Sequence, residues 1–283
     1  MGNKTQLLHR VVEEELRERP EKFFMRDRCG MFICTEGSVR ILFFNKSYEV
    51  TPGGLALFHP FVKIVFKDIS NTLKGYLGEL DLARALPIIN QVLGVENIEA
   101  IKSEPVVQIK NGEFNKLITK VEEYIDETDA LKREMTAIKQ CEPICKALLK
   151  SRNETLMLDV LNTYFLTKSK SVSHPTSHDL VFQKFMMDLQ QNYMNHRDTM
   201  FYARRSTLSP KYFSTVVRNV SGAAPLEWII QTVISVAQNY LTDTTMTIKE
   251  IAAVLGFTSQ PVFCKYFKRY TTLSPKEYRR SHK

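Results

Sequence analysis

Residues 247–270 read TIKEIAAVLGFTSQPVFCKYFKRY and have the pattern of two short helices joined by a turn. Thr247 and Glu250 have the spacing of a capping box, in which each side chain satisfies a backbone N–H of the first helical turn. The apolar residues of this first helix repeat at helical spacing and are Ile248, Ile251 and Leu255. Gly256 follows them and can adopt the positive φ found at many helix ends, so we predict that the first helix stops there.

A second helix is predicted to begin near Ser259, which can cap it, and Pro261, whose missing N–H costs nothing in a first helical turn. The aromatic residues predicted to face inward are Phe263, Tyr266, Phe267 and Tyr270. The residues left on the outer face are Gln260, Cys264, Lys265, Lys268 and Arg269. A short helix, a glycine turn and a second helix with a basic face are typical of a helix-turn-helix. Two amphipathic core helices with solvated lysines would give the same pattern.

The motif occurs a second time, fifty positions earlier in the chain. The corresponding pairs are Ser209 and Ser259, Phe213 and Phe263, Val217 and Phe267, Arg218 and Lys268, Pro225 and Pro275, Glu227 and Glu277, and Trp228 and Tyr278. Before the turn the offset is forty-nine, and the corresponding pairs are Ala203 with Ala252 and Leu208 with Phe257. The second turn is therefore predicted to be one residue longer. Two copies in one chain are hard to explain by packing alone, and together they can place two recognition helices in successive major-groove faces.

Two stretches resemble the DNA-binding domain of AraC-type transcription regulators, namely LSPKYFSTVVRNVSG (208–222) and EIAAVLGFTSQPVFCKYFKRYTTLSPKEYRR (250–280). The resemblance covers about the last 105 residues. Its most specific parts are A-x-x-L-G-F-x-S-Q, F-x-K-Y-F-K and S-P-x-E-Y-R. It implies binding to double-stranded DNA, activation or repression of transcription, and RNA polymerase as a partner. Ser206, Pro261 and Thr272 depart from the family, which favours Leu, a small polar residue and Gly at these positions.

The predicted DNA contacts lie on the second helix of each motif and near the end of the chain. Lys211, Ser214 and Thr215 match the base-reading positions of the family in the first motif. In the second motif the predicted base-reading residues are Gln260, Cys264 and Lys265; an amide suits adenine, and an ammonium suits guanine O6 and N7. The residues predicted to hold phosphates, and so to supply affinity without sequence information, are Arg218, Lys268, Arg269, Lys276, Arg279 and Arg280.

The positive charge of the chain is concentrated in the segment that carries the two motifs. The net charge is +8; residues 177–283 hold 14 Lys+Arg against 7 Asp+Glu, whereas residues 1–176 hold 25 against 24. A basic half joined to a nearly neutral half is what a polyanion-binding domain attached to a second domain should show. A solvated basic face is the alternative interpretation.

The composition is that of an ordinary globular protein, with 43% hydrophobic and 25% charged residues. No apolar run approaches the length of a membrane span, and the start, MGNKTQLLHRVVEEELRERP, lacks the apolar core of a signal peptide, so we expect no membrane association. None of the five cysteines forms a C-x-x-C pair, which favours reduced thiols in a cytoplasmic protein.

The segment 22–67 has the pattern of short strands, with turn residues at Glu36-Gly37, Asn45-Lys46 and Pro52-Gly53-Gly54. Hairpins at this spacing favour a small barrel or jelly roll, whose interior can hold one small molecule. AraC-type regulators commonly carry a cupin-like barrel here, which YEVTPGGLALFHP (48–60) resembles weakly. His59 is the only histidine of this segment, so we expect neither a metal set nor catalysis, and no cofactor.

A helical region is predicted to follow the strands. Further strands are expected around residues 73–82 and 105–109, with a short helix around 83–93 between them. An apolar stripe from Phe114 to Ile125 begins a helix, and two more are predicted at 134–150 and 154–168. Part of their apolar surface is interpreted as a homodimer contact; packing on the barrel alone is the alternative.

These observations predict an α+β chain of two domains. Residues 1–167 are expected to form a cupin-like sensor and dimerisation domain with helices, 168–178 a linker, and 179–283 an all-α domain with two helix-turn-helix motifs joined by a long helix, 225–241. The predicted function is that of a sequence-specific DNA-binding transcription regulator modulated by a small-molecule effector in the barrel. The alternatives are a nonspecific or architectural DNA-binding protein and a cupin enzyme tethered to DNA.

Overall fold

The computed structural model describes residues 7–18, 23–25, 28–43, 46–85, 88, 95–168 and 176–281. The chain is of mixed α+β type and divides into two compact units. Met1–Leu80 and Ala100–Ser173 form the unit that we call the sheet unit, and Asp81–Glu99 and His174–Lys283 form the helical unit. Residues 81–99 thus cluster with the carboxyl-terminal helices, a grouping that the sequence pattern does not indicate.

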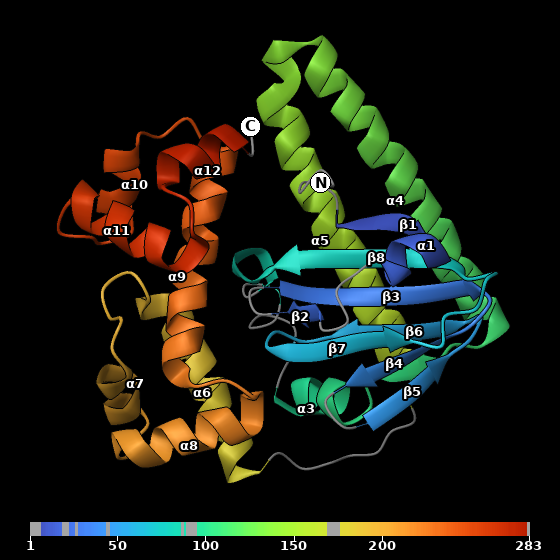
Figure 1. Cartoon of the computed structure of the whole chain (residues 1–283), viewed down its shortest axis with the longest axis horizontal. Helices are drawn as coiled ribbons and strands as arrows, with labels where there is room; N and C mark the ends of the chain where they lie inside the picture. The colour runs from blue at the N-terminus through green and yellow to red at the C-terminus, as the bar shows by residue number, and fades with distance from the viewer. Residues whose placement is uncertain are drawn as a thin grey trace. The chain divides into compact units, whose positions relative to one another are not determined.

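Nine strands form two sheets within the described residues (Figure 1). The five-stranded sheet has the order β1 (Leu8–Val12), β8 (Lys74–Asp81), β3 (Arg28–Glu36), β6 (Gly54–Phe58) and β9 (Val106–Gln108). The four-stranded sheet has the order β2 (Phe23–Met25), β7 (Val62–Lys67), β4 (Val39–Phe43) and β5 (Lys46–Val50). β3 pairs antiparallel with β6, and β4 with both β5 and β7. Among the described strands, only the predicted turn between β4 and β5 closes a hairpin. The other two predicted hairpins are wrong, because β3 and β4, and likewise β5 and β6, lie in different sheets.

The two sheets are separate, so the predicted closed, cupin-like barrel is not confirmed. Both sheets contribute to one apolar core, because alternate residues of each strand point to the same side. The core residues from the strands are Val11, Phe32, Cys34, Val39, Ile41, Phe43, Val50, Ala56, Phe58, Val62, Ile64 and Leu77. The rings of Phe43 and Phe58 are 5.7 Å apart, and those of Phe58 and Phe66 are 6.3 Å apart.

The predicted turns have the expected backbone where the structure describes them. Gly37 lies between β3 and β4 with φ of +70°, and Gly53 precedes β6 with φ of +89°. Residues 44–45, in the turn predicted at Asn45-Lys46, lie outside the described residues. The pattern missed β1 and the short helix α1 (Glu13–Arg17) that follows it, because charged residues dominate this stretch.

His59 follows β6 and is partly buried. Its Nδ1 donates to the carbonyl of Pro60, with 2.7 Å between the two atoms, and burial lowers its pKa to about 4. The ring is therefore neutral near pH 7. Among the described residues, no group of three or more His, Cys, Asp or Glu side chains is placed to hold a metal ion. The five cysteines are all free thiols.

Two long helices complete the sheet unit, and they correct the predicted helix boundaries. α4 (Asn111–Ala137) and α5 (Glu142–Thr167) lie side by side as a hairpin (Figure 1), joined by the 3-10 turn η1 (Lys139–Cys141). The predicted helices 134–150 and 154–168 are wrong, because the chain breaks at 138–141 and not near 151–153. Asn153 is buried and accepts a hydrogen bond from the Tyr124 hydroxyl at 2.6 Å, which keeps this polar stretch helical.

The intervening segment is described in part. α3 (Val95–Ser103) precedes β9, and residues 82–85 are helical. Most of the helix predicted around 83–93 lies outside the described residues, as do positions 169–175 of the predicted linker. Thr176 and Asp179 form a capping box, so that the next helix begins at Ser177, inside the predicted linker.

The helical unit contains the two motifs and the helices around them (Figure 1). In chain order these are α6 (Ser177–Asn192), α7 (Thr199–Arg205), α8 (Pro210–Ser221), α9 (Pro225–Asp243), α10 (Ile248–Val254), α11 (Gln260–Thr271) and α12 (Pro275–Ser281). The predicted long helix is α9, and it buries Trp228, Ile229 and Val233. It runs from the first motif to the second.

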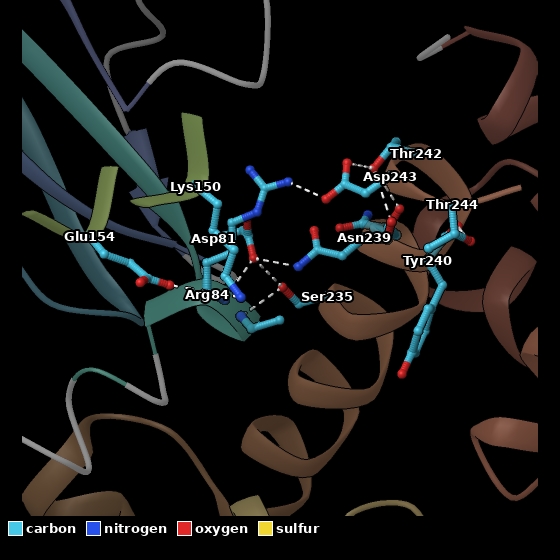
Figure 2. Close-up of polar contacts among 12 residues, drawn as sticks. Asp81, Arg84, Lys150, Glu154, Ser235, Asn239, Tyr240, Thr242, Asp243 and Thr244 are labelled. Carbon is cyan, nitrogen blue, oxygen red and sulfur yellow. Dashed lines mark hydrogen bonds and ion pairs between the residues drawn. The ribbon is translucent and has the colours of Figure 1, made fainter. Parts of the chain in front are cut away.

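Asp81, the last residue of β8, and residues that follow it bond to α9 within the helical unit (Figure 2). The Asp81 carboxylate accepts from Ser235 Oγ at 3.3 Å and from Asn239 Nδ2 at 3.1 Å. Arg84 pairs with Asp243 at 2.6 Å and with Asp81 at 3.3 Å. Ser235 is fully buried. This polar cluster explains why the segment after β8 belongs to the helical unit.

No single described helix is both long and apolar enough to cross a membrane. α8 and α9 meet the length and composition criteria only as a pair, and the two are bent by 67°.

Candidate nucleic-acid interface

The two motifs have the same construction, as the internal repeat predicts. Shifting α8 by fifty positions gives the bounds of α11, and shifting α7 by forty-nine gives those of α10. The turn after α7 covers residues 206–209 and the turn after α10 covers residues 255–259. The prediction that the second turn is one residue longer is therefore confirmed.

The backbone of the two turns is equivalent. Thr207 has φ of +56° and Gly256 has φ of +72°, so the left-handed residue occupies the same place in both motifs. The next N–H bonds back to the first helix in each case. Leu208 N donates to Ala203 O at 3.0 Å, and Phe257 N donates to Ala252 O at 2.9 Å.

The first helix of the second motif begins as predicted. Thr247 Oγ1 accepts from Glu250 N at 3.2 Å, and Glu250 accepts from Thr247 N at 2.7 Å. These bonds stabilise the ionised Glu250 and lower its pKa. The predicted capping box is confirmed.

Ser259 occupies the N-cap position of α11, but its side chain accepts no capping bond from the described residues. The prediction that it caps the helix through its hydroxyl is therefore wrong. Ser209, at the same place in the first motif, accepts from Tyr212 N at 3.3 Å. Pro261 removes only the second N–H of α11, whereas Ser209 bonds the third N–H of α8, so the proline does not account for the difference. The two serines do differ in backbone conformation, with φ of −161° at Ser259 and −66° at Ser209.

The recognition helices α8 and α11 bury one face each. Phe213, Val217, Phe263 and Phe267 are fully buried. Tyr266 is partly buried, whereas 36% of Tyr270 is exposed, so the prediction that Tyr270 faces inward is wrong. Tyr270 lies at the last turn of α11, and its ring contacts that of Tyr266 at 4.9 Å.

The predicted base-reading residues lie on the outward faces of these two helices. Four of them are exposed, and these are Lys211, Thr215, Gln260 and Lys265. Ser214 and Cys264 are partly buried. Both hydroxyls of the first motif bond to their own helix, Ser214 to Pro210 O at 2.8 Å and Thr215 to Lys211 O at 3.1 Å. Their lone pairs remain available to accept hydrogen bonds from a base.

Cys264 contributes a neutral group to this face. Burial raises the pKa of its thiol, so that the thiolate is disfavoured at neutral pH. A neutral thiol is a weak donor and a small apolar contact.

The predicted phosphate contacts divide into two kinds. Five of them are exposed cations, namely Arg218, Lys268, Arg269, Lys276 and Arg280. Arg279 is partly buried and differs from the rest. Its guanidinium donates to Leu241 O at 3.1 Å and to Met246 O at 2.6 Å. These bonds hold α12 against the last turn of α9 and the chain that follows it, so Arg279 has a structural contact whereas the other five side chains are exposed.

The sequence analysis missed an ion pair beneath the first motif. Asp188 of α6 is only 5% exposed and accepts from Arg205 of α7 at 2.7 Å. Its second oxygen has no hydrogen-bond partner among the described residues. The sequence does contain a signal for this ion pair, because Asp188 lies between Met187 and Leu189 in an apolar stripe. A carboxylate buried in such a stripe is expected to have a cationic partner.

Ser206, where the AraC-type pattern favours Leu, also lies in the first motif. Its Oγ is buried and has no partner among the described residues. Thr272, where the pattern favours Gly, adopts φ of +68°, matching Gly222 of the first motif at +81°. The fold accommodates both departures, each at a cost in folding free energy: an unpaired buried hydroxyl at Ser206 and a left-handed backbone at Thr272.

Comparison with known proteins assigns part of the helical unit to a domain family. Residues 202–281 match the family model described as "Helix-turn-helix domain". The chain is similar to an uncharacterised HTH-type transcriptional regulator, YijO, of Escherichia coli K12, with 25% identity over 124 residues, 44% of this chain and 41% of that protein. It is also similar to the regulatory protein PocR of Salmonella typhimurium, with 27% identity over 111 residues, 39% of this chain and 37% of PocR. The chain spans about two fifths of the length of these relatives.

Two solved structures are similar to parts or all of the chain. ToxT from Vibrio cholerae O395 is 14% identical, covers 96% of this chain and 95% of its own, and has a TM-score of 0.47. The DNA-binding domain of AdpA in complex with a target DNA is 26% identical, covers 39% of this chain and 94% of its own, and has a TM-score of 0.33. From the family match and the two repeated motifs, we conclude that residues 202–281 form a helix-turn-helix domain.

Proposed function

We propose that the chain is a sequence-specific DNA-binding transcription regulator of the AraC type. The observation that carries the proposal is the repeat of one helix-turn-helix, with an outward polar face on α8 and another on α11. The match of residues 202–281 to the helix-turn-helix domain supports it. One chain with two such motifs carries both readers of a bipartite site, whereas a single motif needs a dimer.

The proposed readout combines direct base contacts with phosphate contacts. Lys265 donates to guanine O6 and N7, and Gln260 forms a bidentate pair with adenine. In the first motif, the proposed base contacts come from Lys211, Ser214 and Thr215. The phosphate contacts come from the exposed cations Arg218, Lys268, Arg269, Lys276 and Arg280. Arg279 is left out of this set, because its Nε and Nη2 already bond to main-chain carbonyls.

The sheet unit is proposed as the sensor. We propose that a small-molecule effector binds this unit, whose two sheets share an apolar core rich in aromatic rings. An effector of this kind stabilises the fold it binds by an amount that grows with the logarithm of one plus the ratio of its concentration to its Kd. RNA polymerase is the proposed partner in transcription, with activation as the proposed mode. The cytoplasm is the proposed location, consistent with five free cysteines.

A homodimer is proposed through the helix hairpin of the sheet unit. α5 exposes large apolar side chains, and these are Ile144, Leu148, Leu158 and Leu166. Exposed leucines and isoleucines at helical spacing are what a helix-to-helix contact between two copies requires. A dimer would carry four motifs and could bind two bipartite sites, one for each chain.

The test of the proposed function is selection of duplexes from a random library by the full chain, followed by footprinting. A sequence-specific regulator enriches a common sequence and protects a footprint with a defined border. Lys265→Ala is then expected to cost about 1–3 kcal/mol on the selected duplex and much less on a scrambled one. Uniform protection and equal losses on both duplexes would favour a nonspecific or architectural binder. A bound metal in the purified protein would favour the alternative of a cupin enzyme tethered to DNA.

A further inference from the structure

A short loop, residues 193–198, joins α6 to α7 and contacts both helix-turn-helix motifs. Within the helical unit α9 links the two motifs along one line. A single helix fixes the distance between the motifs at its ends. A second contact away from the helix axis adds resistance to bending and rotation of one motif relative to the other. The loop provides such a contact.

The loop is anchored to the first motif through α7. The buried Tyr202 donates its hydroxyl to His196 O at 2.8 Å. The His196 ring is stacked on Phe201, with centroids 3.6 Å apart and planes 4° apart. Asp198 caps α7 by accepting from Phe201 N at 2.9 Å. Three different contacts therefore hold the loop to α7.

Arg197 reaches from this loop to the turn of the second motif. Its guanidinium carbon lies 3.7 Å from the centroid of the Phe257 ring. Its Nη2 donates to Leu255 O, the first carbonyl of the turn, and to Met194 O at 3.3 Å. One planar cation therefore bonds the loop to itself and to the residue that follows α10.

The backbones of the loop and the turn also touch. A Cβ at Gly256 would lie 2.4 Å from Met194 O, and Gly256 holds φ of +72°. Only glycine therefore fits this turn, both for its conformation and for its distance from the loop. Tyr193, the first residue of the loop, packs against the core of the second motif.

Arg197 is in an unusual environment for a cation, because its side chain is partly buried. This burial lowers the pKa of the guanidinium. It still carries its charge, since arginine stays protonated in proteins. No carboxylate among the described residues forms an ion pair with it. Its favourable contacts are instead two carbonyls and aromatic rings, which are directional and hold the two segments in one geometry.

We propose that Arg197 is a positioning residue that sets the distance and rotation between α8 and α11, and therefore the spacing of the two half-sites that the chain accepts. This inference rests on the proposed function. Arg197 touches the turn of the second motif and not its outward face, so it acts through the placement of the recognition helices. Its loss relaxes the spacing requirement.

The test uses the full chain and the duplex that the wild type selects from a random library. A second duplex carries one extra base pair between the half-sites, which adds about 3.4 Å and about 35° of rotation. We expect the wild type to bind the longer duplex about 30-fold more weakly, and Arg197→Met only about threefold more weakly. Arg197→Lys keeps the charge without the planar fork, and we expect an intermediate ratio.

Lys268→Met is the matched control, because it removes one positive charge from a predicted phosphate contact. We expect it to weaken binding to both duplexes by the same factor and to leave their ratio at the wild-type value. If thermal melting shows that Arg197→Met is unfolded, the ratio for Arg197→Lys decides. Wild-type ratios in both Arg197 variants would overturn this inference alone. A wild type that selects no common sequence would overturn the proposed function and, with it, this inference.

Discussion

Thr272 ends the second recognition helix in a left-handed backbone conformation that β-branched residues rarely adopt. Gly222 ends the first one in the same conformation without a Cβ. Neighbouring bonds keep the two ends alike, since Ser221 and Thr271 each donate to a carbonyl in the preceding turn and to one beyond the helix. The second helix end is therefore strained at one position.

Thr272→Gly is expected to raise the free energy of unfolding by about 1 kcal/mol, because it relieves a left-handed conformation that costs about 1–2 kcal/mol, less the entropy that glycine adds to the unfolded chain. Gly222→Thr is the reciprocal change and should lower it by a similar amount. Urea titration of both variants measures the effect. An unchanged midpoint for Thr272→Gly would show that this helix end carries no strain.

The cations near the end of the chain are expected to separate into two classes. Lys268→Ala should reduce the slope of log binding constant against log salt concentration by about 1, because one phosphate contact is lost. Arg279→Ala should leave the slope as it is and lower the free energy of unfolding by about 1–3 kcal/mol, because two main-chain carbonyls lose their donor. Salt titrations and urea titrations of both variants check the assignment. The same slope change in both would contradict it.

At the scale of elements, local signals predicted the helical unit well. The capping box at Thr247 and the positive φ at Gly256 are properties of a few neighbouring residues, and the repeat offset appears when the sequence is compared with itself. Ser259 was an exception, because whether an N-cap serine bonds its helix depends on its backbone conformation, and its φ of −161° differs from the −66° of Ser209. The break between α4 and α5 was misplaced because a polar stretch near residue 152 looks like a loop until its partner on α4 is known.

The buried contact between α4 and α5 gives a prediction for these helices. Tyr124 donates to Asn153 and accepts from Leu7 N at 2.7 Å, and the ring is 4% exposed. Tyr124→Phe leaves both groups without this partner and is expected to cost about 1–3 kcal/mol of unfolding free energy. Tyr270→Phe, on a side chain 36% exposed, is the control and should stay within about 0.5 kcal/mol. Equal effects in urea would contradict the role of the Tyr124 hydroxyl.

At the scale of the whole molecule, the uneven charge and the repeat predicted which segment would bind a polyanion. Contacts between residues far apart in the sequence could not be predicted from local patterns. Alternation identifies a strand but not its neighbour, so two separate sheets could not be told from a closed barrel. The grouping of residues 81–99 with α9 depends on contacts between residues about 150 positions apart, such as Asp81 with Ser235. The role of Arg197 depends likewise on a contact between distant parts of the chain.

The proposed homodimer predicts concentration-dependent association of the full chain in sedimentation velocity. The double variant Ile144→Glu with Leu148→Glu should weaken it at least about tenfold, because each apolar side chain contributes about 1.5–3 kcal/mol when fully buried. Lys116→Ala on α4, whose side chain is 71% exposed, is the control and should associate as the wild type does. A wild type that stays monomeric at every concentration would refute the dimer.

Because residues 81–99 group with the helices, a recombinant fragment that starts at residue 176 would lack part of its own unit. Ser235, which is fully buried in the intact chain, would lose the Ala83 N–H and the Asp81 carboxylate that it bonds. The truncated fragment would expose the part of α9 that these residues cover. A domain fragment cut at residue 176 would therefore be less stable than the same helices in the intact chain. Adding residues 81–85 as a synthetic peptide should restore the missing hydrogen bonds.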